Sequence, residues 1–311
     1  MTRFLITGIR GSGGSYLADF LADKGDVRGI ARWHTVPTLR PPSPYMVYEC
    51  DLTDFASVMR ALDAAQPDFV FHLASYANVR ASFDTPLAVL DNNIRGTANL
   101  FEALRLLKMA PIVLMCSTPE VYGQVRGVIS EDHPVNPVNP YAVSKLAQEA
   151  LSYCYYKAYG LPVVRTRMFT YINPRRADLF ATSFAMQVAR VEAGQQDILT
   201  HGNLDSVRTM LDVRDAVRAY WIAASKGVTG EVYNIGGTKT VTVGEFLETL
   251  RGQARCPVKT VQDPNLMRPT DVTLQIPDCR KFQAATGWEP QIGFEDSVRH
   301  LLDHCRKTVS A

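Results

Sequence analysis

The chain has 311 residues, of which 46% are hydrophobic, and a formal net charge of +2 at pH 7. These values are typical of a globular protein with one large core or two lobes, and they do not indicate a nucleic-acid partner. No signal peptide precedes the first strand-like segment and no apolar run is long enough to span a bilayer, so we expect a cytoplasmic protein without a membrane partner. The six cysteines have neither Cys-x-x-Cys spacing nor a companion histidine cluster, which predicts free thiols and no metal site.

The first predicted elements are a strand, a tight turn and a helix. An apolar run at residues 4–6 is followed by Gly8, Gly11 and Gly14 in the spacing G-x-x-G-x-x-G, and apolar residues then recur at helical spacing over residues 16–21. Without Cβ atoms the turn can fold tightly and bring backbone N–H groups and the helix N-terminus close to a pyrophosphate. Three glycines also occur in ordinary connections, but the strand before them and the helix after them favour a dinucleotide site.

The second predicted strand ends at Arg32, where a dinucleotide fold places the residue that meets the adenosine ribose. An acidic residue there would favour NAD, whereas Arg32 has no Asp or Glu beside it and suits the 2′-phosphate of NADP. NAD is the alternative if Arg32 faces solvent. Residues 32–45 contain four prolines and are expected to form a loop at the mouth of the nucleotide site.

Asp51 and Leu52 follow the third predicted strand, and we expect them to contact the adenine, whose amino group Asp51 could bind. Alternatively, Asp51 caps the helix that begins nearby, a role that Asp54 could also fill.

Strand-like and helical segments alternate over the first half of the chain. The apolar runs "RFLIT", "DVRGIAR", "MVYECDL", "DFVFHLAS", "PIVLMCST" and "LPVVRTRMF" are separated by amphipathic segments of helical length. This alternation predicts an α/β fold with a Rossmann-type, doubly wound parallel sheet. The rhythm loosens from about Tyr171, so we expect a dinucleotide-binding domain over residues 1–170 and a smaller C-terminal substrate-binding lobe over 171–311, interleaved with returning strands.

Tyr141 and Lys145 are four residues apart on a predicted helix and therefore project from one face. A tyrosine works as acid or base near neutral pH only if its phenolate is stabilised. A lysine ammonium one turn away can lower its pKa and also donate to a nicotinamide ribose. Ser117 or Thr118, at the end of a strand, could bind a substrate hydroxyl.

Glu120 is the carboxylate nearest to Thr118 in the chain, and we expect it to point towards the same site. It could remove an acidified proton next to a keto group and pass it to a departing hydroxyl, which is the chemistry of a dehydratase. Alternatively, Glu120 accepts a hydrogen bond from a sugar hydroxyl, and the reaction is a reduction.

The chain resembles the extended short-chain dehydrogenase/reductase family over essentially its whole length. The resemblance rests on "TGIRGSGG", "DLTD", "HLAS", "NNIRGT", "CSTPEVYG", "YAVSK" and "RPTDV". Within that family it looks most like GDP-mannose 4,6-dehydratases and GDP-4-keto-6-deoxymannose reductases. The resemblance implies a bound NADP(H), contacted also by Leu73, Ala74 and Asn93, a nucleotide-sugar substrate linked to GDP, and a homodimer formed by the helix after Asn93 and the Tyr141 helix.

In the second half of the chain, Arg208 and Arg268 fall in turn-rich segments where guanidinium groups can grip a diphosphate, and Asp271 could take ribose hydroxyls. Each arginine could instead lie on a solvated face. The hexose pocket is expected around Thr170 and Asn173, where the chain departs from the family by replacing an Asn and a Gly.

Other departures from the family are Pro119, before Glu120, and the pair Arg175-Arg176, which could meet additional negative charge, a larger sugar or only solvent. We therefore predict a GDP-mannose 4,6-dehydratase. The alternatives are a reductase of a 4-keto sugar, a 4-epimerase and a non-catalytic dinucleotide sensor on the same fold.

Overall fold

A computed structural model describes residues 1–32, 44–266 and 273–310. Its main feature is a seven-stranded sheet in the order β11-β7-β5-β4-β1-β2-β3, in which all neighbouring strands run parallel. The strands are β1 (Arg3–Thr7), β2 (Asp26–Ala31), β3 (Met46–Glu49), β4 (Phe69–His72), β5 (Ile112–Ser117), β7 (Val163–Met168) and β11 (Val232–Ile235). The order reverses between β1 and β4, which is the switch point at which such sheets bind ligands. The predicted doubly wound parallel sheet is confirmed.

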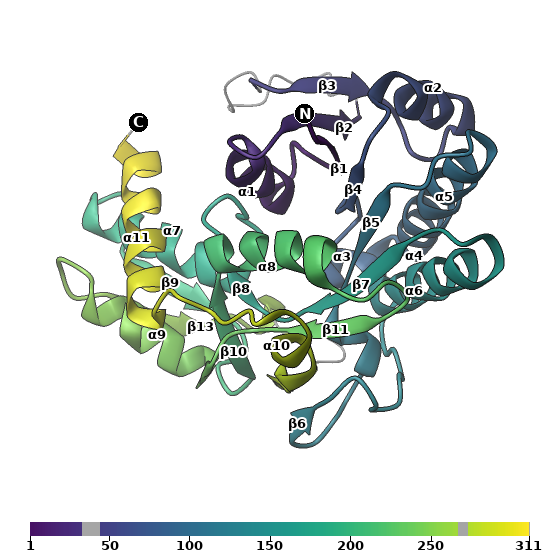
Figure 1. The fold of residues 1–311 in the computed structure, drawn as a ribbon. Coiled ribbons are helices and arrows are strands. Elements are labelled where there is room, and N and C mark those ends of the chain that lie inside the picture. Colours follow the sequence, from purple (N-terminus) through teal and green to yellow (C-terminus); the bar gives the residue numbers. More distant parts are fainter. Residues whose placement is uncertain (33–43, 267–272, 311) are drawn as a thin grey trace.

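Helices cover both faces of this sheet because successive strand residues point to opposite sides. On one face of the sheet, Phe4 and Ile6 pack with Leu17 of α1 (Ser12–Leu21) and Tyr220 of α8 (Val213–Lys226). Leu5 points to the opposite face and belongs to a second hydrophobic core. Burial of each such side chain contributes about 1.5–3 kcal/mol. The second core is formed with α2 (Phe55–Ala65), α5 (Gly96–Leu106) and α6 (Pro140–Tyr159). Figure 1 shows these three helices on the side of the sheet away from α8.

Shorter helices connect β4 to α5 and follow β5. They are α3 (Val79–Asp84), α4 (Pro86–Leu90), the π-helical η1 (Asp91–Arg95) and the 3₁₀-helical η2 (Pro119–Tyr122).

A second group of strands lies beyond the end of the sheet that carries β11 (Figure 1). A five-stranded sheet has the order β12-β10-β14-β6, with β8 paired to β10, and β9 pairs with β13. These strands are β6 (Val128–Ile129), β8 (Tyr171–Ile172), β9 (Ile198–His201), β10 (Val207–Asp212), β12 (Lys239–Thr242), β13 (Lys259–Gln262) and β14 (Leu274–Pro277).

The helices of this second group share a hydrophobic core of their own. They are α7 (Phe180–Glu192), α9 (Val243–Gly252) and α11 (Phe294–Ser310), while η3 (Pro264–Leu266) and α10 (Arg280–Thr286) lie in the connections. The strand β11 and the helix α8 return to the main sheet. The division at residue 170 remains a prediction.

Local sequence explains where the functional helices begin and end. The side chain of Asn139 caps α6 by accepting a hydrogen bond from the Ala142 N–H, Pro140 takes the first turn, and Gly160 ends the helix in a left-handed conformation. Asp54 caps α2 by accepting from the backbone N–H groups of Ala56 and Ser57. Asp54, and not Asp51, therefore fills the capping role.

Among the described residues, no helix has the length and apolar character needed to cross a bilayer. Residues 33–43 of the predicted loop, and the predicted substrate residues Arg268 and Asp271, lie outside the described part of the chain.

Candidate active site

The glycine-rich turn folds back on itself at the carboxyl ends of β1 and β4. Gly8 has φ of +74°, and a Cβ there would lie 3.0 Å from the Cα of Ala74. The backbone N–H of Gly11 donates to the Gly8 carbonyl at 2.8 Å, and a Cβ on Gly14 would overlap that same oxygen. The turn thus needs glycine for its own fold, and it brings Gly8, Gly11, Gly14, Leu73 and Ala74 to one edge of the sheet.

We expect Gly14→Ala to lose NADP binding and to lower stability by about 1–3 kcal/mol, because the new methyl group must displace the Gly8 carbonyl. Gly252→Ala is the matched control, since a Cβ there meets nothing within 4 Å. Thermal unfolding and cofactor titration of both variants check this prediction. Normal NADP affinity in Gly14→Ala would show that the turn does not hold the cofactor.

Arg32 follows β2 and is exposed, and Tyr76 from the loop after β4 holds its side chain. Its Nη1 donates to the Tyr76 hydroxyl at 2.8 Å, and its guanidinium lies 4.9 Å from the centre of that ring. Asp51 accepts hydrogen bonds from the backbone N–H and the hydroxyl of Thr53 at 2.9 and 2.8 Å. Arg32 therefore presents a cation at the end of β2, as the sequence predicts for the adenosine end of a cofactor.

Arg32→Ala should weaken NADP binding about tenfold to a hundredfold, the range expected for one charge-assisted contact to phosphate, with little change for NAD. Tyr76→Phe removes the hydrogen bond but leaves the guanidinium, so it should keep the preference for NADP. Equilibrium titration with both dinucleotides measures the effect. Equal losses for NADP and NAD in Arg32→Ala would refute the 2′-phosphate contact.

Tyr141, Lys145 and Thr118 form the centre of the site, and all three are buried, with exposed fractions of 8%, 3% and 7%. Burial raises the pKa of Tyr141; the Arg176 guanidinium and a hydrogen bond with Thr118 act in the opposite direction. Burial also lowers the pKa of Lys145, whose Nζ donates to the Cys116 carbonyl at 2.8 Å.

The sequence predicts that Lys145 lowers the pKa of Tyr141, and this role of Lys145 remains a prediction.

Ser117 and Thr118 are neighbours but have different surroundings, because consecutive residues at a strand end point to opposite sides. The Ser117 hydroxyl donates to Glu149, which lies one turn after Lys145 on α6. Glu149 is in turn paired with Arg167 of β7 at 2.7 Å, and both are buried. Ser117 therefore joins β5 to α6 and β7 beneath the site, and Thr118 is the hydroxyl next to Tyr141.

The Glu120 carboxylate is buried, and two amide groups orient it. Its Oε2 accepts from Nδ2 of Asn139 at 3.0 Å, and its Oε1 accepts from Nε2 of Gln275 at 2.8 Å. Its charge raises the pKa of Tyr141, which places it within electrostatic reach of the phenol. Gln275 belongs to β14, so Glu120 lies where the main sheet meets the second group of strands.

Asn93 is buried and joins the loop after β4 to the catalytic helix. Its Oδ1 accepts from the Tyr76 N–H at 2.8 Å, and its Nδ2 donates to the Ser144 hydroxyl at 2.8 Å. Ser144 also donates to the carbonyl of Tyr141 at 2.7 Å. Asn93 thereby ties the loop after β4, which carries Tyr76, to the helix α6, which carries Tyr141 and Lys145.

The predicted substrate residues that the structure describes lie on or near β8 and β10. Thr170 is half-buried and accepts a hydrogen bond from Leu211 through its carbonyl. Asn173 is 1% exposed, and its Nδ2 has no hydrogen-bond partner in the described part of the chain. Arg208 is buried on β10, where its Nη1 donates to the Val207 carbonyl.

Sequence reasoning missed Tyr171 in this region. The Tyr171 hydroxyl would lie 3.1 Å from a Cβ on Gly13, so it rests against the glycine-rich turn. Arg176, which the sequence names as one of an arginine pair, is ion-paired with Asp178 at 3.0 Å and donates to the carbonyl of Ala77 in the loop after β4. The Arg-Arg pair after Pro174 was visible in the sequence, but only the pairing of β8 with β10 brings it to the site.

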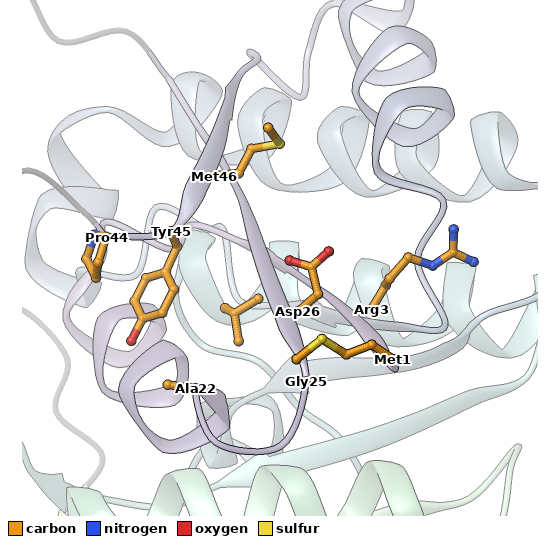
Figure 2. A pocket seen from close by; sticks show the side chains of 9 residues that line it. Met1, Arg3, Ala22, Gly25, Asp26, Pro44, Tyr45 and Met46 are labelled. Carbon is orange, nitrogen blue, oxygen red and sulfur yellow. The ribbon is translucent and has the colours of Figure 1, made fainter.

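A cavity of about 500 Å³ lies at the amino ends of β1, β2 and β3 (Figure 2). Its lining includes Arg3, Asp26 and Met46, the first residues of β1, β2 and β3. Because ligands of open α/β sheets bind at the carboxyl ends of the strands, this cavity is not the cofactor site.

Comparisons with known proteins agree with this geometry. The family model described as GDP-mannose 4,6 dehydratase matches residues 5–301. The chain belongs to this family. This family member is 34% identical to GDP-6-deoxy-D-mannose reductase of Pseudomonas aeruginosa, covering 99% of this chain and 98% of that protein. It is 31% identical to GDP-mannose 4,6 dehydratase 1 of Arabidopsis thaliana, covering 96% and 88%.

Among solved structures, the family member resembles RMD from Pseudomonas aeruginosa complexed with NADPH, with a TM-score of 0.85, 31% identity and coverage of 99% and 100%. It also resembles UDP-glucose 4-epimerase of Thermus thermophilus in complex with NAD, with a TM-score of 0.88, 28% identity and coverage of 98% and 99%. The predicted membership of the nucleotide-sugar branch of the extended short-chain dehydrogenase/reductases is confirmed. The chain is an enzyme of this branch.

Proposed function

We propose that this protein is an NADP-dependent GDP-mannose 4,6-dehydratase. The observation that carries the proposal is Glu120, a carboxylate oriented by Asn139 and Gln275 within electrostatic reach of Tyr141. A dehydratase needs a second acid–base group beside the tyrosine, whereas a simple reductase does not. The family match and the relative from Arabidopsis thaliana, named a GDP-mannose 4,6 dehydratase, support the same reaction.

The residues at the switch point fit a dinucleotide, because Gly8 and Gly14 form a backbone cradle that any side chain would fill. Arg32 would hold the 2′-phosphate, and Lys145 the nicotinamide ribose. The likeness to the NADPH complex from Pseudomonas aeruginosa supports NADP, and the likeness to the NAD complex from Thermus thermophilus keeps NAD as a second possibility. When bound, NADP supplies the hydride acceptor for C4 of the hexose and the hydride donor for C6.

The chain's own residues then move the protons. Tyr141 removes the proton from the C4 hydroxyl, which Thr118 orients by a hydrogen bond. The C4 ketone acidifies the C5 proton, which Glu120 removes. Glu120 then delivers this proton to the C6 hydroxyl, which leaves as water. As hydride adds to C6, C5 takes up a proton from solvent through Glu120, and Tyr141 releases the proton that it took from the C4 hydroxyl, so that the net change is the loss of one water from the sugar.

For the rest of the substrate we propose Arg208 as the cation for the diphosphate and Thr170 and Asn173 as hexose contacts. Arg208 is a buried guanidinium, and the Nδ2 of Asn173 is a buried donor with no partner among the described residues. Arg268 and Asp271 keep their predicted roles towards the diphosphate and the ribose.

A reductase of a 4-keto-6-deoxy sugar is the second candidate. The observation in its favour is the match to GDP-6-deoxy-D-mannose reductase along almost the full length of both chains. In that reaction Tyr141 gives a proton to the C4 oxygen, NADPH is consumed, and Glu120 only accepts a hydrogen bond from the sugar.

We also propose a cytoplasmic homodimer formed through α5 and α6. Leu106 ends α5, and Tyr153 and Tyr159 lie in the last two turns of α6. All three are large exposed apolar or aromatic side chains that a partner subunit would cover.

A panel of nucleotide sugars tests the proposed substrate class. Purified protein is mixed with NADP or NADPH and with GDP-, UDP- or dTDP-linked hexoses, and products are separated by chromatography. Turnover confined to GDP-hexoses is expected. Turnover only of a UDP-hexose to its 4-epimer would contradict the proposal, and cofactor binding without any turnover would indicate a dinucleotide sensor.

A further inference from the structure

We propose that Gln275 is a positioning residue that fixes the orientation of the Glu120 carboxylate towards the sugar. The inference rests on the proposed function in taking Glu120 as the carboxylate that meets the substrate. Gln275 belongs to β14 of the second group of strands, 155 positions from Glu120 in the chain. It therefore adds a residue of that second group to a site whose acid–base residues come from η2 and α6.

The contact between the two side chains is direct. Nε2 of Gln275 donates to Oε1 of Glu120 at 2.8 Å, and this is the one hydrogen bond that the Gln275 side chain makes within the described part of the chain. Gln275 is buried, with an exposed fraction of 3%. A buried amide costs free energy unless it finds a partner, whereas an apolar side chain would fill such a strand position without that cost. The bond to Glu120 explains why a glutamine lies here.

Strand pairing fixes the place of Gln275. On one side β14 pairs with β6, the first strand after η2, with Ile276 opposite Val128. On its other side β14 pairs with β10, and Gln275 lies opposite Arg208. Residues that lie opposite each other on paired strands point to the same face of a sheet. Gln275 and the proposed diphosphate contact Arg208 thus share one face, and the donor to Glu120 lies beside the expected substrate.

Asn139 holds the other oxygen of the same carboxylate. Its Nδ2 donates to Oε2 of Glu120 at 3.0 Å, while its Oδ1 accepts from the Ala142 N–H and caps α6. Tyr141 lies in this first turn of α6. One donor therefore ties Glu120 to the helix of Tyr141, and the other ties it to β14. Because each carboxylate oxygen can accept two hydrogen bonds, each retains a position for a proton or a sugar hydroxyl.

The test removes the donor on β14 and leaves the cap of α6 in place. Gln275→Met keeps the length of the side chain but has no N–H, so Glu120 loses one of its two fixed contacts. We expect kcat for water loss from GDP-mannose to fall about tenfold to a hundredfold, since displacement of a catalytic group by about 1 Å can cost a hundredfold. KM and NADP affinity should change little.

Two further substitutions change the donor in other ways. Gln275→Lys restores a donor and should recover part of kcat. Gln275→Glu has almost the shape of glutamine but faces Glu120 with an acceptor, and it should lose at least as much kcat as Gln275→Met. Wild-type kcat in folded Gln275→Glu or Gln275→Met, with folding checked by thermal unfolding, would overturn the proposal.

Gln187 of α7 provides the matched control. Its Oε1 accepts from the Thr200 N–H at 2.8 Å and its Nε2 donates to the Thr200 carbonyl at 3.1 Å, so this amide joins α7 to β9 in the second group of strands. Gln187→Met should lower the melting temperature and leave kcat unchanged. A loss of kcat equal to that of Gln275→Met would mean that any loosening of these strands impairs the reaction, and would overturn the proposal.

A double-mutant cycle separates positioning from packing. In Glu120→Gln there is no carboxylate to orient, so adding Gln275→Met should lower the remaining activity no further. A purely structural role of Gln275 predicts the same additional loss in both backgrounds, and that result would contradict the proposal.

The wild-type reaction distinguishes a failure of this inference from a failure of the proposed function. Absence of water loss from GDP-mannose in the wild-type protein would refute the dehydratase assignment. The same four enzymes of the cycle are then compared with a GDP-4-keto-6-deoxy sugar and NADPH. A misplaced Glu120 loses its hydrogen bond to the sugar, so Gln275→Met should raise KM in the wild-type background and not in Glu120→Gln. An equal rise in both backgrounds would overturn the role of Gln275.

Discussion

Tyr141→Phe should lower turnover by about a hundredfold or more and leave NADP binding nearly unchanged. The substitution removes only the hydroxyl that exchanges a proton with the substrate, and general acid–base catalysis contributes about this much. The ring is buried beside Thr118 and Lys145, so its packing is retained. Steady-state kinetics and cofactor titration measure the two quantities separately.

Tyr156→Phe is the control for this prediction, because Tyr156 lies on the same helix but beyond the catalytic turn. It should behave like the wild type. If Tyr141→Phe kept wild-type turnover, the phenol would not be the acid–base group and the assigned mechanism would fail.

Glu120→Gln should abolish water loss from GDP-mannose, with a fall of about a hundredfold to ten-thousandfold. It should also abolish exchange of the C5 proton with solvent deuterium. The variant keeps the shape of the side chain and removes the base, so NADP binding should persist. Its amide must face the donors of Asn139 or Gln275, and thermal unfolding is needed to show that the fold is kept.

Glu131→Gln is the matched control for Glu120. Glu131 is a half-buried carboxylate that accepts a hydrogen bond from the backbone of Asn234, and Gln can accept the same bond. Its activity should equal that of the wild type. Full C5 exchange in Glu120→Gln would mean that another group removes the proton.

Local sequence patterns were sufficient to predict those parts of the site whose residues lie close together in the chain. The glycine turn needs only a strand, three glycines and a helix, and Tyr141 and Lys145 need only one helical turn. Because successive side chains of a strand point to opposite sides, the sequence predicts that Ser117 and Thr118 face different surroundings. It does not predict which of the two contacts Glu149.

The other half of the site depends on contacts between distant segments. Gln275 reaches Glu120 from 155 positions away through the pairing of β14 with β10 and β6, and Arg176 arrives through β8. No periodicity in the chain encodes such pairings. For the same reason the sequence names the pair Arg175-Arg176 but does not show that Arg175 pairs with Asp19 of α1 while Arg176 donates to the carbonyl of Ala77.

Mass spectrometry of the GDP-mannose reaction tests the central claim most directly. Wild-type protein with a catalytic amount of NADP⁺ is predicted to convert GDP-mannose into a product lighter by one water, with deuterium incorporated at C5 in heavy water. A GDP-mannose sample left unchanged, together with consumption of a GDP-4-keto-6-deoxy sugar at the expense of stoichiometric NADPH, would contradict the dehydratase assignment and establish the reductase.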